Sequence, residues 1–175
     1  VKYNLDIRNY FTIFDIFTFA GRVNSGIISG WLSDYDQYES ILFEKFYLGG
    51  SNTLRAIKPL RLLTNKTDGL DNDNDGLVDF EDDDESNDIP SGNIAMLLSN
   101  FEIRFPLPSR FGGVIFIDGG NISTDFNTLK PTDLIWNYGV ALTFNLPFGP
   151  IRIDYAQDSN NQKINQVQLG FLYAF

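Results

Sequence analysis

The sequence predicts an all-β fold, an antiparallel transmembrane β-barrel, from three observations. Apolar and polar residues alternate with period two over long segments, which is typical of strands. These segments reach about ten residues, the length that crosses a bilayer at a tilt. Their connections alternate between short turns and long loops, as in outer-membrane barrels. A soluble β-sandwich shows the same alternation of side chains, but it has no reason to keep this asymmetry of connections.

Seven strands are expected along the chain. They cover residues 2–14, 16–29, 93–106, 111–122, 135–147, 149–158 and 165–175. Short turns are expected near residues 14–15, 107–109 and 147–149, and long loops at 30–92, 123–134 and 159–164. The alternation is clearest in residues 136–146, where Tyr138, Val140 and Leu142 point one way and Asn137, Gly139 and Ala141 the other. In a membrane barrel the apolar face meets lipid, and the polar, glycine-rich face lines the lumen.

Composition excludes several kinds of site. The 175 residues include no cysteine and no histidine, so the chain can form neither a thiolate metal site nor a catalytic triad that uses histidine. We therefore expect no enzymatic activity. There is no run of 18 apolar residues that would predict a transmembrane helix. Aromatic residues are abundant, with 16 Phe and 8 Tyr, which suits the aromatic girdles of a barrel.

The negative charge is concentrated in one insert, residues 65–88. The chain carries a formal net charge of -10, and this insert holds eleven acids and one lysine, so the remainder is neutral. Acidic residues follow the spacing of an EF-hand-like calcium loop with Gly76 at its tight turn, and these are Asp71, Asp73, Asp75, Asp79 and Asp82. The loop resembles a thrombospondin type-3 repeat, since the last ligand is Asp82 and no helices flank it. We expect a structural Ca²⁺ here; the alternative is a disordered acidic loop.

Four segments, taken in order, resemble the BamA/TamA family of outer-membrane assembly barrels. They are residues 43–55 (FEKFYLGGSNTLR), 100–107 (NFEIRFPL), 113–121 (GVIFIDGGN) and 146–155 (LPFGPIRIDY). Their order and spacing match the last seven strands of that family. The resemblance implies that the chain is the C-terminal part of a barrel of sixteen strands.

The resemblance also implies a loop that folds back into the lumen. Arg55 would pair there with Glu102 and Asp118, which both point inward on the expected strands, and Gly49 and Gly50 would let the loop bend sharply. The alternative is a solvated Arg55 above a wet lumen. The family has Gly and an aromatic residue after this arginine, and this chain has Ala56 and Ile57 instead.

The C-terminus carries a second resemblance, to the pattern that assembly machinery reads on the last strand of a barrel. Its residues here are Gln168, Gly170, Tyr173 and Phe175. Such an edge strand can pair with another strand by β-augmentation. The alternative is an ordinary amphipathic strand that ends in Phe.

The family resemblance implies outer-membrane protein assembly in the bacterial outer membrane, with the acidic loop extracellular. Expected partners are lipid, other outer-membrane proteins as substrates, periplasmic or lipoprotein assembly factors and the rest of the barrel; no nucleic acid is expected. A secretion or transport pore and a calcium-braced surface barrel are alternatives. Seven strands leave three arrangements open: part of a longer chain, half of a split barrel, or a smaller barrel with 36–48 as an eighth strand.

The calcium interpretation predicts heat on titration. Calorimetry with Ca²⁺ on a peptide of residues 65–88, or on the whole protein, should show saturable binding, because alternating carboxylates wrap one hard cation and relieve their mutual repulsion. No heat at millimolar Ca²⁺ would favour the disordered loop.

Overall fold

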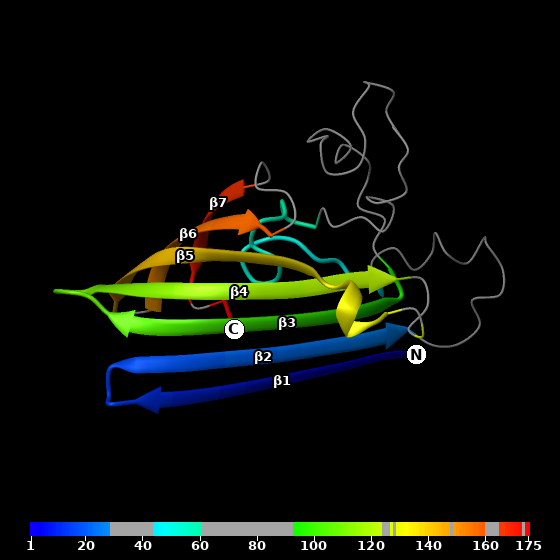
Figure 1. Ribbon diagram of the computed structural model, residues 1–175, viewed down its shortest axis with the longest axis horizontal. Coiled ribbons are helices and arrows are strands. Elements are labelled where there is room, and N and C mark those ends of the chain that lie inside the picture. Colours follow the sequence, from blue (N-terminus) through cyan, green and yellow to red (C-terminus); the bar gives the residue numbers. More distant parts are fainter. Residues whose placement is uncertain are drawn as a thin grey trace, which may run out of the picture.

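A computed structural model of the chain describes residues 1–28, 44–60, 93–123, 127, 129–147, 149–159, 165–172 and 174–175. Seven strands form a single antiparallel sheet whose order follows the sequence (Figure 1). They are β1 (Lys2–Ile13), β2 (Phe17–Ile28), β3 (Ala95–Pro106), β4 (Phe111–Ser123), β5 (Ile135–Leu146), β6 (Gly149–Asp158) and β7 (Asn165–Phe171), with a 3-10 turn, η6 (Pro131–Asp133), before β5. The predicted all-β, antiparallel partial barrel is confirmed.

The sheet is curved, and residues 44–60 lie inside the curve. Figure 1 shows β5, β6 and β7 bending over, with this segment in cyan beneath them. We call residues 44–60 the arginine loop. The described residues include no helix long and apolar enough to cross a membrane.

Alternating side chains divide the sheet into two faces. On β5, Tyr138, Val140 and Leu142 are exposed, whereas Asn137 and Ala141 are buried on the concave side. Exposed apolar residues on the other strands, such as Ile117 on β4, Ile153 on β6 and Leu169 on β7, extend this face into a broad apolar outer surface. This surface is suited to contact with lipid. Apolar side chains that would be unfavourable in water can lie against the hydrocarbon core of the bilayer.

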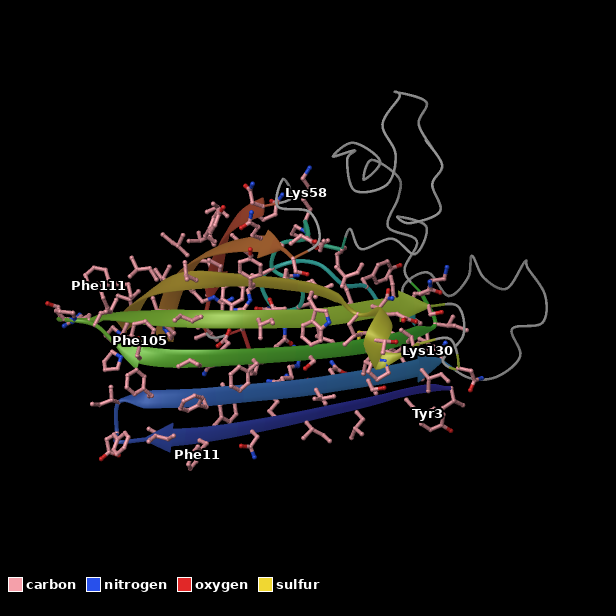
Figure 2. All side chains as sticks on the ribbon, in the orientation of Figure 1. Tyr3, Phe11, Lys58, Phe105, Phe111 and Lys130 are labelled. Atoms are coloured by element: carbon pink, nitrogen blue, oxygen red, sulfur yellow. The ribbon has the colours of Figure 1, made fainter. Side chains whose placement is uncertain are left out.

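The two ends of the sheet differ in their connections. At one end, Phe14 and Asp15 both have φ of 54°, in a tight turn closed by a hydrogen bond from Ile16 N–H to Ile13 O of 3.1 Å. Phenylalanines gather at this end, as Figure 2 shows for Phe105 and Phe111. The rings of Phe111 and Phe144 lie 5.1 Å apart, and those of Phe17 and Phe105 6.3 Å apart. This end therefore carries the short turns and one aromatic girdle.

The last strand is shorter than predicted. We expected it to reach residue 175, but β7 ends at Phe171 and Phe175 is buried. The physical reason is the left-handed backbone of Leu172, with φ of 66°, whose N–H bonds to Pro150 O at 2.7 Å. The chain leaves the sheet there, and Phe175 packs near Ala20 on the lumen face of β2.

The third strand also begins later than predicted, at Ala95 rather than residue 93. Asn93 makes an isolated bridge with Phe46 instead. This bridge is the only pairing that the described part of the expected eighth strand, 44–48, makes; residues 36–43 lie outside the described residues.

The lumen wall is less polar than predicted. Where β2, β3 and β4 approach the long-loop end, their inward residues are Ile28, Met96, Leu98 and Ile122. These residues pack against apolar side chains of the arginine loop, listed as Phe46, Leu48, Leu54 and Ile57. The wall is apolar there because it is the floor on which a loop packs, and it does not face water.

Two glycines give a test of how closely β5 packs against its neighbours. A Cβ at Gly139 would lie 2.0 Å from Tyr155 O on β6 and 2.5 Å from the Phe116 ring on β4, whereas a Cβ at Gly21 would have no atom within 4 Å. We expect Gly139→Ala to destabilise the barrel by about 1–3 kcal/mol through overpacking. Gly21→Ala should be nearly neutral. Thermal unfolding of the full-length protein in detergent measures both, and equal midpoints would contradict the packing.

Candidate functional site

The arginine loop owes its shape to two glycines and two turns. Gly49 and Gly50 have φ of 112° and 104°, a region that side chains disfavour. The N–H of Gly50 bonds to Leu54 O at 3.2 Å and to Ile57 O at 3.0 Å, so the loop folds back on itself. This fold places Leu54, Arg55 and Ile57 against the wall of the lumen.

The structure brings Arg55, Glu102 and Asp118 together, as the family resemblance implied. Arg55 Nε donates to Asp118 Oδ2 at 2.8 Å, and Arg55 Nη2 donates to Asp118 Oδ1 at 2.7 Å. Arg55 Nη1 donates to Glu102 Oε1 at 2.5 Å. All three side chains have an exposed fraction of 0%. This is a bidentate, charge-assisted contact with a second carboxylate at the remaining nitrogen.

An aromatic ring and a further carboxylate complete the surroundings of Arg55. The guanidinium carbon lies 3.4 Å from the centroid of the Phe116 ring, in a cation–π contact. Asp154 Oδ1 lies 3.9 Å from Arg55 Nη1. Burial lowers the pKa of Arg55, but the hydrogen bonds and charge of Asp118, with the charges of Glu102 and Asp154, outweigh it and raise that pKa. The guanidinium is therefore a fixed cation.

The departure from the family pattern is accommodated. Ala56 has an exposed fraction of 0% and packs with Val114 and Phe116, and its backbone is not left-handed. Ile57 packs into the apolar contact between loop and wall. Neither position needs glycine, because small and apolar side chains fill the space that the loop leaves beside the wall.

Side chains from four strands also hold the backbone of the loop. Arg152 Nη2 donates to Ser51 O at 2.8 Å, and Arg22 Nη1 donates to Asn52 O at 3.1 Å. On β3, Asn100 Nδ2 donates to Thr53 O at 2.7 Å. On β7, Gln168 Nε2 donates to Arg55 O at 2.8 Å and to Ile57 O at 3.2 Å. The loop is thus attached to strands on both sides of the curved sheet.

The predicted residues of the terminal-strand signal lie in different surroundings. Gln168 lies on β7, but its side chain faces inward and hydrogen-bonds to the arginine loop in the lumen. Gly170 is buried beneath the Arg152 guanidinium, where a Cβ would lie 3.1 Å from Arg152 Nη2. Phe175 is buried in the lumen, and Tyr173 lies outside the described residues.

Arg104 connects the chain end to the same cluster. Its Nε donates to Glu102 Oε2 at 2.8 Å, and its Nη2 donates to Phe175 O at 3.2 Å. Its guanidinium carbon also lies 5.4 Å from the Phe175 ring centroid. Glu102 therefore accepts from Arg55 with one oxygen and from Arg104 with the other.

Sequence reasoning missed several residues of this site. They are Arg22, Asn100, Arg104, Arg152 and Asp154. Each occupies an inward position of its strand, so a polar side chain at the inward parity was the available signal. The predicted calcium ligands, from Asp71 to Asp82, lie outside the described residues, and their role stays a prediction.

A comparison with family models decides the family. The model described as the Omp85 superfamily domain matches residues 1–175. The chain belongs to the Omp85 superfamily. This membership supports a place in the bacterial outer membrane and accords with the predicted BamA/TamA-like family.

A solved structure shows the same fold. It is BamA from Haemophilus ducreyi lacking POTRA domains 1-3, with a TM-score of 0.64 and 15% sequence identity. The match covers 97% of this Omp85 chain and 34% of the BamA chain, so the chain spans about one third of that structure.

Arg55 gives a test of the buried pairing. Arg55→Ala leaves Asp118 buried without its cation and removes one of the two arginines that bind Glu102, and we expect a loss of about 3–5 kcal/mol in unfolding free energy. Lys58→Ala, in the same loop but only half-buried, should change stability little. Thermal unfolding in detergent measures both. Adding Asp118→Asn to Arg55→Met should recover part of the loss, because Glu102 stays paired with Arg104, and no recovery would argue against charge compensation.

Proposed function

We propose that the full-length barrel assembles other β-barrel proteins into the outer membrane, without enzymatic chemistry. The observation that carries this proposal is the arginine loop docked in the lumen, with Arg55 on Glu102 and Asp118, in a member of the Omp85 superfamily. The fold shared with BamA supports it. Substrates would be other outer-membrane proteins, and periplasmic or lipoprotein factors would deliver them.

The edge strand β7 offers a physical route for such assembly. It has 7 residues, against 12 in β1, and in the described sheet it pairs only with β6. An unpaired strand edge within a bilayer costs several kcal/mol per backbone group, so this edge needs another strand beside it. A short closing seam is easier to open than a long one, because fewer hydrogen bonds must break. An incoming substrate strand would pair there by β-augmentation.

The outward side chains of β7 fit this role. Val167, Leu169 and Phe171 are exposed on the apolar face, and Gln166 and Gln168 face the lumen. A substrate strand with the same alternation would continue both faces of the barrel across the seam. The strand edge would therefore select for amphipathic strands of the kind that outer-membrane barrels contain.

We propose in addition that the insert at residues 65–88 binds one Ca²⁺ through Asp71, Asp73, Asp75, Asp79 and Asp82 and braces the extracellular side of the long loop. The sequence spacing supports this role. This calcium-binding role would be structural and separate from the assembly of other barrels.

A secretion or transport pore is the alternative function. The apolar contact between the arginine loop and the lumen wall disfavours it, since a conducting pore would have to expose Leu48, Leu54 and Leu98 to water. The two functions predict different consequences of losing the protein.

Depletion of the full-length protein in its own cell is the test. The assembly function predicts that the levels of many folded outer-membrane barrels fall together, and that wild-type protein restores them. Restoration by Lys58→Ala and not by Arg55→Ala would connect assembly to the docked loop. Normal barrel levels with loss of one exported cargo would instead establish a secretion pore.

A further inference from the structure

We propose that the arginine loop holds the terminal strand β7 in position from inside the lumen, and that Gln168 is the positioning residue that makes this connection. The inference rests on the proposed function for its meaning, since β7 would be the seam strand. It concerns a contact that neither the family match nor the resemblance to BamA specifies.

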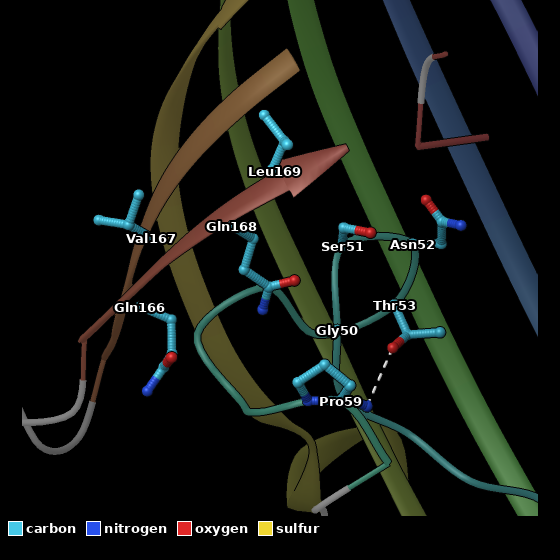
Figure 3. Close-up of a pocket in the computed structure, with 10 residues that line it drawn as sticks. Gly50, Ser51, Asn52, Thr53, Pro59, Gln166, Val167, Gln168 and Leu169 are labelled. Atoms are coloured by element: carbon cyan, nitrogen blue, oxygen red, sulfur yellow. Dashed lines mark hydrogen bonds between the residues drawn. The ribbon is translucent and has the colours of Figure 1, made fainter. Parts of the chain in front are cut away.

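The geometry of Gln168 supports the connection. Its Nε2 donates to Arg55 O at 2.8 Å and to Ile57 O at 3.2 Å. The turn from Leu54 to Ile57 aims both carbonyls at β7. Figure 3 shows the Gln168 side chain directed at the loop, whereas Val167 points away from it.

The loop can hold β7 because the loop itself is held. The side chain of Arg55 is fixed on β3 and β4 by Glu102 and Asp118, while its carbonyl accepts from Gln168. One residue therefore connects the centre of the sheet to its last strand across the lumen. Releasing the Arg55 side chain would also release the carbonyls to which β7 is bound.

A second connection ends at the same place. The residues after β7 return to the lumen, where Arg104 binds Phe175 O and Glu102 together. Glu102 also binds Arg55. The strand and the segment that follows it are both attached to the Arg55 cluster, so the state of the loop and the position of the chain end are linked.

The neighbouring Gln166 is a matched control. It lies two residues earlier on the same face of β7, is half-buried like Gln168, and lines the same pocket between β7 and residues 49–53 (Figure 3). No hydrogen bond joins it to the described part of the loop. A carboxylate at either position adds the same charge to the same strand, but only at position 168 does it replace a donor and oppose two carbonyl oxygens.

Hydrogen exchange followed by mass spectrometry, on the full-length protein in lipid nanodiscs, tests the connection. Gln168→Glu should speed exchange in peptides covering 165–171 and 49–57 by about tenfold or more, because it removes the hydrogen bonds to Arg55 O and Ile57 O from a local opening equilibrium. Gln166→Glu should leave both peptides at the wild-type rate. Equal acceleration by the two variants, or none by Gln168→Glu, would overturn the proposal.

A double variant tests whether Gln168 acts through the loop. Arg55→Ala should by itself speed exchange of 165–171, and adding Gln168→Glu should then change that rate no further. Additive effects would show that Gln168 stabilises β7 independently of Arg55 and would contradict the inference. These rates decide only the attachment of β7, while the depletion experiment decides the assembly function, so the two can fail separately.

Discussion

The burial of one guanidinium constrains the rest of this structure. Arg55 has no access to water, so its charge must be balanced where it lies, and Asp118 and Glu102 do this from two adjacent strands. Both carboxylates must point inward on these strands, and in the register of β3 with β4 Asp118 lies opposite Asn100, two residues from Glu102. The loop must then bend sharply enough to reach them, which requires the left-handed backbone of Gly49 and Gly50. The conformation of the loop and the polarity of this part of the lumen thus depend on a single pairing.

The charges extend beyond this pairing without upsetting the balance. Arg152 binds Asp154, and Arg104 binds Glu102. Together with the pairing of Arg55, this makes one cluster of three guanidiniums and three carboxylates. A neutral cluster of this kind is costly to break at any member, because the remaining partner stays buried and uncompensated. The cluster also favours one docked position of the loop, since a loop docked in another position would leave a charge unpaired. The apolar contacts around Leu48 and Leu54 stabilise the docked loop by burying apolar surface, and the charges define which docked position is allowed.

The sequence was sufficient for the fold and for the centre of the site. Period-two alternation located all seven strands, because the apolar outer face must repeat with the pleat of the sheet. The pairing of Arg55 with Glu102 and Asp118 followed from a family resemblance together with their inward parity. The inward turn of Phe175 could not be predicted, since it depends on the left-handed backbone of Leu172. Leucine rarely adopts this conformation, so the sequence gives no signal for the turn. The hydrogen bonds from Gln168, Arg152 and Arg22 to loop carbonyls could not be predicted either, because every residue has a main-chain carbonyl whatever its side chain.

Ala174 and Phe175 are buried beside Ala20 in the lumen and are not part of the last strand of the sheet. Phe175 is withdrawn from the outer face and lies in the lumen, where it meets Arg104. The part of this segment that belongs to the sheet is therefore the seven residues of β7, from Asn165 to Phe171. On the lumen side, β7 is attached through Gln168 to the docked loop. In the proposed assembly function, a strand of this length has few hydrogen bonds to break before it can exchange partners, and its contact with the loop would hold it in position until that exchange.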